Sequence, residues 1–198
     1  MITSLAIERL VEMANGPIVV RGALSKESCK IIEVYSLIME KRSEIYHETS
    51  VIDKDLVGSY FSYADAMTES LLLFLKKDVE NAVGLELLPT YSFYRVYRKG
   101  HELPKHTDRN ACEVTASVCL ANGHDGENWP LFIDGNPFYL NAGDMVVYKG
   151  AELVHWREPA KFDGYQVQAF IHYVDKNGQY SEWELDKRKS IFRKDREG

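Results

Sequence analysis

Three residues of types that bind metal ions stand out in the sequence: His106, Asp108 and His155. His106 and Asp108 are separated by one residue, and side chains two apart in an extended chain point to the same side. A histidine on a neighbouring strand would complete a set of three ligands on one face of a metal ion. Two imidazoles and one carboxylate leave the opposite face of the ion open for reactants.

The same three residues can also be explained without a metal ion. A His-x-Asp pair arises easily by chance in a chain with 6 histidines. His106 and Asp108 could form a solvated turn with a local hydrogen bond, and His155 could be a plain core or interface histidine. The context favours the metal, because His106 follows a strand-like run and a turn at Gly100, and His155 begins another such run after the turn at 141–144.

Helices are expected in the first part of the chain. Residues 4–14 predict a short helix or frayed arm, 18–20 a strand, and 25–39 an amphipathic helix capped at Ser25. Apolar residues three or four apart between 64 and 83, followed by Gly84, predict the most regular helix. The segment 46–63 is expected to be a loop with a short strand.

After Gly84 the apolar residues repeat every second position, which is typical of strands. The predicted strands are 91–98, 111–120, 129–133, 137–140, 144–148, 153–157 and 165–174. Helices followed by seven or eight strands indicate an α+β protein in which N-terminal helices pack on one sheet of an antiparallel sandwich or barrel. The double-stranded β-helix, or jelly roll, is the natural candidate.

The 198 residues are expected to form a single domain. We divide it into a helical support at about 1–88, a jelly-roll core at about 89–176 and a charged tail at 177–198. The tail is expected to be a short surface helix or to be partly disordered, because it alternates charges and has few apolar anchors.

Composition argues against some classes of binding partner and indicates the cellular compartment. The formal net charge of -6 argues against nucleic acid and anionic membranes, since both attract basic surfaces. Three cysteines without CxxC spacing indicate neither a disulfide framework nor a zinc knuckle. Residues 1–15 lack the pattern of a signal peptide, and no run is apolar and long enough to span a bilayer, so a cytoplasmic location is expected.

Residues 90 to 175 resemble the Fe(II)- and 2-oxoglutarate-dependent dioxygenases, in particular the prolyl-4-hydroxylase-like branch. In that branch a strand ending in Tyr and a glycine turn precede His-x-Asp, as Tyr97 and Gly100 precede His106 here. A Gly-Asp turn at 143–144, a hydrophobic strand at 145–148 and the second histidine, His155, then follow in the family's order. The run Leu-Ser-Lys-Glu-Ser-Cys at 24–29 is also similar to a helix opening found in many of these enzymes.

The resemblance implies that His106, Asp108 and His155 bind Fe(II). It also implies an enzyme that uses O2 and 2-oxoglutarate, with ascorbate in support, to hydroxylate an unactivated C–H bond. The resemblance does not choose among three kinds of substrate: a protein side chain such as proline, an amino acid or a small metabolite. It also does not decide whether the protein is a monomer or a homodimer. Two alternatives remain: a cupin-type metal enzyme using the same three ligands without 2-oxoglutarate, and a non-catalytic jelly-roll binding module.

The chain departs from the family at the cation that holds the distal carboxylate of 2-oxoglutarate. The family places an Arg or Lys on the last strand, where this sequence aligns the neutral Gln166. Arg157 is the favoured substitute, because it lies two residues after His155 and shares its inward face. It could instead be a surface or ion-paired residue. Arg95, which alternates with Tyr97, is the runner-up.

Alternation along 165–174 places Gln166, Gln168, Phe170 and His172 on one face, which we take as inward. Buried glutamines need hydrogen-bond partners, so Gln166 and Gln168 are predicted to contact the co-substrate together with Tyr97. We expect His172 to line or support the wall of the site, because the three-ligand set is already complete.

Two further residues are candidates for substrate contact or support. Arg109 is expected to hydrogen-bond the carboxylate of Asp108 or to reach the substrate, although an exposed arginine fits the sequence equally well. Trp129, near the expected mouth of the fold, would pack against the substrate or close the core.

Overall fold

The computed structural model describes residues 16–46, 59–125 and 129–191. Its strands form two antiparallel sheets, and the six-stranded sheet has the order β1-β8-β5-β10-β3-β2. Those strands are β1 (Ile18–Val20), β8 (Met145–Tyr148), β5 (Val114–His124), β10 (Gly164–Asp175), β3 (Leu87–Tyr97) and β2 (Tyr60–Tyr63). The four-stranded sheet has the order β4-β9-β6-β7, with β4 (Leu103–His106), β9 (His155–Arg157), β6 (Leu131–Ile133) and β7 (Asn136–Phe138).

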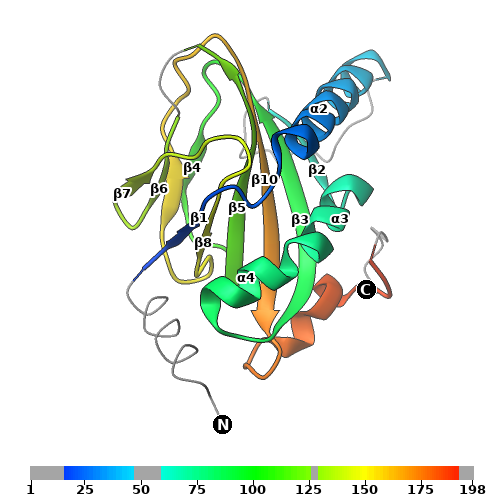
Figure 1. Ribbon diagram of the computed structural model, residues 1–198, viewed down its shortest axis with the longest axis vertical. Coiled ribbons are helices and arrows are strands. Elements are labelled where there is room, and N and C mark those ends of the chain that lie inside the picture. The colour runs from blue at the N-terminus through cyan, green and yellow to red at the C-terminus, as the bar shows by residue number, and fades with distance from the viewer. Residues whose placement is uncertain (1–15, 47–58, 126–128, 192–198) are drawn as a thin grey trace.

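In the described part of the chain, three α-helices cover the six-stranded sheet on the side away from the four-stranded sheet (Figure 1). They are α2 (Lys26–Tyr46), α3 (Ala66–Phe74) and α4 (Lys76–Val83). The predicted α+β double-stranded β-helix, with helices on one of its sheets, is confirmed. The helix expected over 4–14 lies outside the described residues.

The predicted helix over 64–83 is two helices, because the chain bends at Leu75. The α3 helix is capped by Asp65, whose Oδ1 accepts a hydrogen bond from Met67 N at 3.0 Å. Leu75 has a ψ of -6°, and α4 follows it and ends at Gly84 with a φ of +74°. Leu75 is fully buried, so the bend lets both helices turn apolar faces to the same sheet.

The two faces of the central strands have different compositions. On β10, Val167, Ala169 and Ile171 belong to the apolar core beneath the helices. The alternate residues Gln168 and Phe170 face the space between the two sheets, where they lie opposite inward residues of β3. This confirms the inward face predicted for the closing strand, and it makes that space unusually polar for a protein interior.

The strand β4 was not among the predicted strands. It contains Pro104, which cannot donate to a ladder and is therefore confined to sheet edges. Accordingly β4 lies at the edge of the four-stranded sheet and pairs only with β9, with His106 opposite His155. Tertiary pairing, rather than local propensity, makes this segment a strand.

The described part of the tail does contain a short helical segment, one of the two predicted states, but it is kinked and carries buried charged residues instead of only resting on the surface. Residues Ser181–Lys187 form two short 3₁₀ turns joined by a kink. Asp186 and Arg188 are buried, at 1% and 4% exposure. Each has a partner of opposite charge in the body of the protein, since Arg188 Nη2 lies 3.1 Å from Glu69 Oε2 and Arg109 binds Asp186. Paired charges, rather than apolar anchors, hold this segment.

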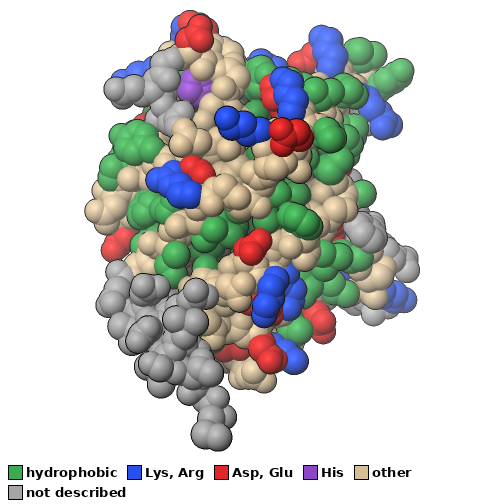
Figure 2. Space-filling view, in the orientation of Figure 1, with side chains coloured by type: hydrophobic (Ala, Val, Ile, Leu, Met, Phe, Trp, Pro, Cys, Tyr) green, Lys and Arg blue, Asp and Glu red, His purple; other side chains and the backbone are tan. Residues whose placement is uncertain are grey.

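Acidic and basic side chains are interspersed over the face shown in Figure 2. Within the described residues, no helix is both long enough and apolar enough to cross a bilayer.

We expect Glu69→Ala to destabilise the protein strongly, because it leaves the buried Arg188 without its carboxylate and frees the Ser92 amide, which donates to Glu69 Oε1 at 2.9 Å. Loss of one partner of a buried ion pair costs about 3–5 kcal/mol. The free energy of unfolding in urea measures the effect.

Glu86→Ala is the matched control, because the Glu86–Lys176 pair is exposed at 69% and 54%. Its loss is expected to cost less than about 1 kcal/mol. Equal losses in the two variants would contradict the anchoring role of the buried pair.

Candidate metal centre

The structure brings His106, Asp108 and His155 together at the paired ends of β4 and β9. Asp108 Oδ1 lies 3.5 Å from His106 Nε2 and 3.7 Å from His155 Nε2. All three ligand atoms lie within 4.8 Å of one another. The three atoms are therefore spaced closely enough to share a metal ion.

Backbone carbonyls orient both imidazoles. His106 Nδ1 lies 2.8 Å from the carbonyl of Pro104, and His155 Nδ1 lies 2.9 Å from that of Leu153. A ring that donates from Nδ1 to a carbonyl keeps the lone pair on Nε2, which is the atom facing Asp108. Each histidine is thus held in the tautomer that a metal requires.

Asp108 is fixed from two sides. Thr115 Oγ1 donates to Asp108 Oδ2 at 3.1 Å, which leaves Oδ1 facing the histidines. The Asp108 amide donates to the carbonyl of Gly150 at 2.9 Å. Gly150 approaches so closely that a Cβ there would lie 2.5 Å from Asp108 Oδ2. Position 150 therefore requires glycine.

The electrostatics suit a metal ligand set. The pKa of Asp108 falls to about 2, because a hydrogen bond with His106 and the nearby imidazoles outweigh the effect of burial, which raises it. Burial lowers the pKa of His155, which favours the neutral imidazole that binds metals. Burial also lowers the pKa of His106, but its hydrogen bonds to Asp108 and to the Pro104 carbonyl outweigh this and raise it overall.

A second group, Asp108, Cys112 and His172, also has ligand atoms within 4.8 Å of one another. Burial raises the pKa of the Cys112 thiol, and a protonated thiol is a poor ligand. His172 Nδ1 lies 3.0 Å from Thr115 Oγ1, and burial lowers the pKa of this histidine to about 4. We therefore take His172 as a neutral wall residue that supports Asp108 through Thr115.

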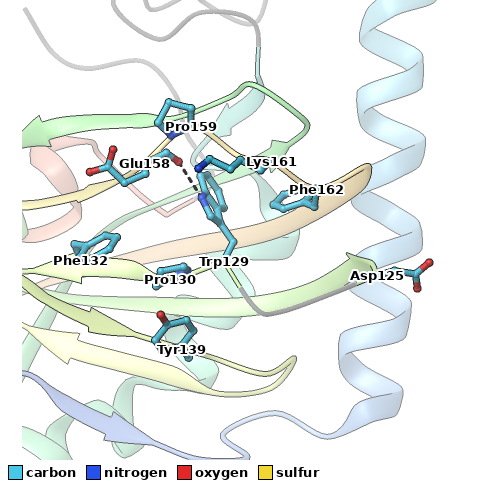
Figure 3. Close-up of a pocket in the computed structure, with 9 residues that line it drawn as sticks. All are labelled: Asp125, Trp129, Pro130, Phe132, Tyr139, Glu158, Pro159, Lys161 and Phe162. Carbon is cyan, nitrogen blue, oxygen red and sulfur yellow. Dashed lines mark hydrogen bonds between the residues drawn. The ribbon is translucent and has the colours of Figure 1, made fainter.

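A cavity of about 200 Å³ opens onto the three ligands. Besides the ligands, it is lined by four aromatic rings, one leucine, one histidine and one arginine: Tyr91, Phe93, Tyr148, Phe170, Leu103, His172 and Arg95. A larger hollow of about 390 Å³ lies around Trp129, Pro130 and Phe162 and contains none of the three ligands (Figure 3). The smaller cavity is therefore the candidate site.

Arg157 lies deeper between the sheets, on the same face of β9 as His155, and is 2% exposed. Its Nη1 donates to the carbonyl of Trp129 at 2.6 Å, and its guanidinium lies 4.8 Å from the Trp129 ring centre. Within the described residues no carboxylate pairs with it. Among the described residues, Arg157 is therefore neither a surface residue nor part of an ion pair.

Several buried polar atoms around Arg157 have no hydrogen-bond partner in the described part of the chain. They are Arg157 Nε, Tyr97 Oη, Tyr148 Oη and Gln166 Oε1. Tyr97 and Tyr148 both act electrostatically on Arg157, and Asp108 acts on Tyr148, so Tyr148 links this group to the ligands. Burial raises the pKa of both tyrosines, which keeps them as hydroxyl donors.

The two glutamines of β10 use part of their hydrogen-bonding capacity on each other. Gln166 Nε2 donates to Gln168 Oε1 at 3.1 Å, and Gln168 Nε2 donates to Ser117 Oγ at 2.9 Å. Gln168 is therefore satisfied within the fold, whereas Gln166 Oε1 is not. Direct contact of either residue with a co-substrate stays a prediction.

Two sequence candidates lie away from the ligands. Arg109 forms two hydrogen bonds with Asp186, at 2.6 and 2.8 Å, and stacks on Tyr91, so it neither bonds to Asp108 nor lies exposed. Trp129 donates to the carbonyl of Glu158 at 2.9 Å (Figure 3). Its ring also packs edge-on against Tyr97 and lies 4.8 Å from the Arg157 guanidinium, so it closes the interior there.

Sequence reasoning missed Thr115, Tyr148 and Gly150. The alternation of Thr115 with Ser117 inside a buried apolar run was a signal for the first, because small polar residues at every second position indicate a polar inward face. Tyr148 and Gly150 carried no comparable signal. Their roles follow from how β8 and its following turn lie against Asp108.

Comparisons with protein-family models and with curated proteins find no match. Among solved structures, a Pseudomonas putida prolyl-4-hydroxylase has a TM-score of 0.60 at 17% identity, over 85% of this chain and 98% of its own. HygX from Streptomyces hygroscopicus, with nickel, 2-oxoglutarate and hygromycin B bound, has a TM-score of 0.63 at 13% identity, over 86% and 87%.

A viral collagen prolyl hydroxylase from Paramecium bursaria Chlorella virus-1 has a TM-score of 0.58 at 13% identity, over 79% of this chain and 94% of its own. At these identities the likeness is one of fold. The chain has the double-stranded β-helix fold found in these 2-oxoglutarate oxygenases, which confirms the predicted resemblance at that level.

We expect Gly150→Ala to weaken metal binding, because its Cβ would push against Asp108 Oδ2 and the carbonyl of Cys112. Changes in groups that orient metal ligands typically cost about 10- to 100-fold in affinity. Calorimetric titration with Ni(II) measures the change.

Gly135→Ala is the control. Alanine at its φ of +83° strains the backbone, which alanine at Gly150 does not, but a Cβ at position 135 meets nothing within 4 Å. Metal affinity should then match that of the unchanged protein. A folded Gly150→Ala variant with full affinity for Ni(II) would show that this contact does not position Asp108.

Proposed function

We propose that the chain is an Fe(II)- and 2-oxoglutarate-dependent dioxygenase that hydroxylates an unactivated C–H bond. The observation that carries the proposal is the convergence of two histidine Nε2 atoms on Asp108 Oδ1, at 3.5 and 3.7 Å, beside a buried cation without a carboxylate partner in the described residues. The fold shared with known oxygenases supports it.

The donor set fits Fe(II). Two imidazole nitrogens and one carboxylate oxygen on one face, with space opposite, are the ligand types and arrangement of non-haem iron oxygenases. Asp108 supplies the negative charge, and Thr115 and the backbone hold its orientation. Bound there, Fe(II) and 2-oxoglutarate would activate O2 for C–H oxidation, with release of succinate and CO2.

The interior beyond the ligands fits 2-oxoglutarate. A desolvated carboxylate needs charged or hydroxyl donors, and Arg157 Nε, Tyr97 Oη and Tyr148 Oη are buried donors without a partner in the described residues. Arg157 is two residues from His155, about 7 Å along a strand, so one end of a short diacid would reach the metal while the other contacts the guanidinium. Arg157 thus takes the place of the family's cation on the last strand.

The remaining residues exclude water and position the substrate. Tyr91, Phe93 and Phe170 surround the open side of the ligand set with aromatic surface. Such a wall keeps bulk water from the reacting centre and leaves room for one small group near it. These features serve hydroxylation of an amino acid, a small metabolite or an inserted protein side chain.

The proposal is tested by adding Fe(II) and 2-oxoglutarate to the protein without oxygen and recording the visible spectrum. A weak charge-transfer band is expected, followed by succinate once air is admitted. His155→Ala should abolish both, because it removes one of three ligands. Iron binding without band or succinate would instead favour a cupin-type enzyme, and unchanged metal binding in His106→Ala and His155→Ala would favour a non-catalytic binding module.

Arg157→Gln should weaken 2-oxoglutarate binding by about one to three orders of magnitude, because it removes the charge that faces the distal carboxylate. Affinity for Ni(II) alone should stay the same. Titration of 2-oxoglutarate into the Ni(II)-loaded protein measures both quantities.

Lys176→Gln is the control, since Lys176 pairs with Glu86 at the surface, where the two side chains are 54% and 69% exposed. It removes an equal charge without touching the interior, so co-substrate affinity should not change. Full affinity for 2-oxoglutarate in Arg157→Gln would contradict the assignment of this arginine.

A further inference from the structure

A second buried arginine faces the cavity that holds the metal ligands. Arg95 is 3% exposed and lines the same 200 Å³ cavity as His106, Asp108 and His155. It lies on the inward face of β3, opposite Phe61 of β2 and Gln168 of β10. Its guanidinium is therefore part of the wall that a substrate would meet.

The protein leaves the charge of Arg95 largely uncompensated. Three aromatic rings surround its guanidinium, those of Phe61 at 5.7 Å, Phe93 at 5.2 Å and Tyr97 at 6.0 Å. Its hydrogen bond to Ser59 Oγ is long at 3.5 Å, and the Tyr97 hydroxyl that also acts on it is neutral. Cation–π contacts contribute about 0.5–2 kcal/mol each, whereas removing a charge from water costs several kcal/mol.

Other arginines show how this chain normally compensates such a charge. Arg188, at 4% exposure, pairs with Glu69, and the half-buried Arg109 pairs with Asp186. In the described residues, no carboxylate pairs with Arg95 or with Arg157. Among the buried arginines of the described residues, the two that face the space between the sheets are thus the ones that lack a protein anion.

A count of the charges in the occupied site assigns different roles to Arg157 and Arg95. This step rests on the proposed function. The two positive charges of Fe(II) and the one of Arg157 balance the negative charge of Asp108 and the two of 2-oxoglutarate. The charge of Arg95 is left over. A buried site that is short of one negative charge favours a ligand that brings one.

We propose that Arg95 binds the carboxylate of the substrate, and that the substrate is a small monocarboxylic acid. A guanidinium takes a carboxylate through two parallel hydrogen bonds, which also fixes the direction of the rest of the molecule. The apolar body of the acid then lies against Phe93, Phe170 and Leu103, near the open side of the metal ligands. A cavity of about 200 Å³ limits its size.

The test uses the protein loaded with Ni(II) and 2-oxoglutarate, kept without oxygen, and calorimetric titration. The probes are acids paired with their primary amides: phenylacetate and phenylacetamide, 4-methylpentanoate and its amide, and N-acetylproline and its amide. At least one acid should bind about tenfold or more tightly than its amide, as expected for a charge-assisted pair of hydrogen bonds.

Arg95→Gln should bring the affinities of that acid and its amide to within about threefold. The same variant should change the affinities for Ni(II) and for 2-oxoglutarate by no more than about threefold. Arg95→Lys keeps the charge and should retain part of the preference for the acid. The surface control Lys176→Gln should retain all of it.

Two results would overturn the inference. One is that no acid binds more tightly than its amide. The other is that Arg95→Gln weakens 2-oxoglutarate as strongly as Arg157→Gln does, which would make Arg95 the co-substrate's cation. Because formation of the Fe(II) and 2-oxoglutarate chelate is measured on the unchanged protein, failure of the proposed function is seen separately from failure of this inference.

Discussion

The antiparallel pairing of β4 with β9 is the constraint on which the candidate site depends. Its register places His106 opposite His155 and Leu103 opposite Arg157, so one short ladder fixes two candidate ligands and the position of the buried Arg157. Asp108 completes the set from the turn after β4, held by Thr115 and Gly150. A shift of this register by one residue would turn one histidine to the other face of the sheet, and the three ligand atoms would no longer lie together.

The central strands support this ladder with two unlike faces. The face beneath the helices is apolar and well packed, and it supplies the hydrophobic stabilisation of the fold. The face between the sheets carries Arg95, Gln166, Gln168 and His172, all buried. Buried polar groups destabilise a fold unless they are paired. A face with several unpartnered polar atoms therefore indicates ligands rather than a structural core.

The same residue types have structural roles elsewhere in the chain. Arg109 is adjacent in sequence to Asp108, yet its guanidinium turns to Asp186 and fastens the C-terminal segment beside Tyr91. Arg188 is held by Glu69 on α3 in a similar way. Burial alone thus does not separate the two arginines that we propose to bind ligands from those with a structural role. The absence of a carboxylate partner in the described residues does.

The sequence by itself determined the local and periodic features of the protein. Alternation of apolar residues showed the strands and the inward face of β10, and the spacing of His106 and Asp108 indicated a shared side for two ligands. These follow from the two-residue repeat of a strand, which needs no knowledge of distant contacts. The strand β4, the close approach of Gly150, the anchoring of 181–188 and the partners of Arg109, Arg95 and Arg157 were decided by the tertiary structure. Each depends on which group from a remote part of the chain comes within a few ångströms, and charge compensation and close packing act only at that distance.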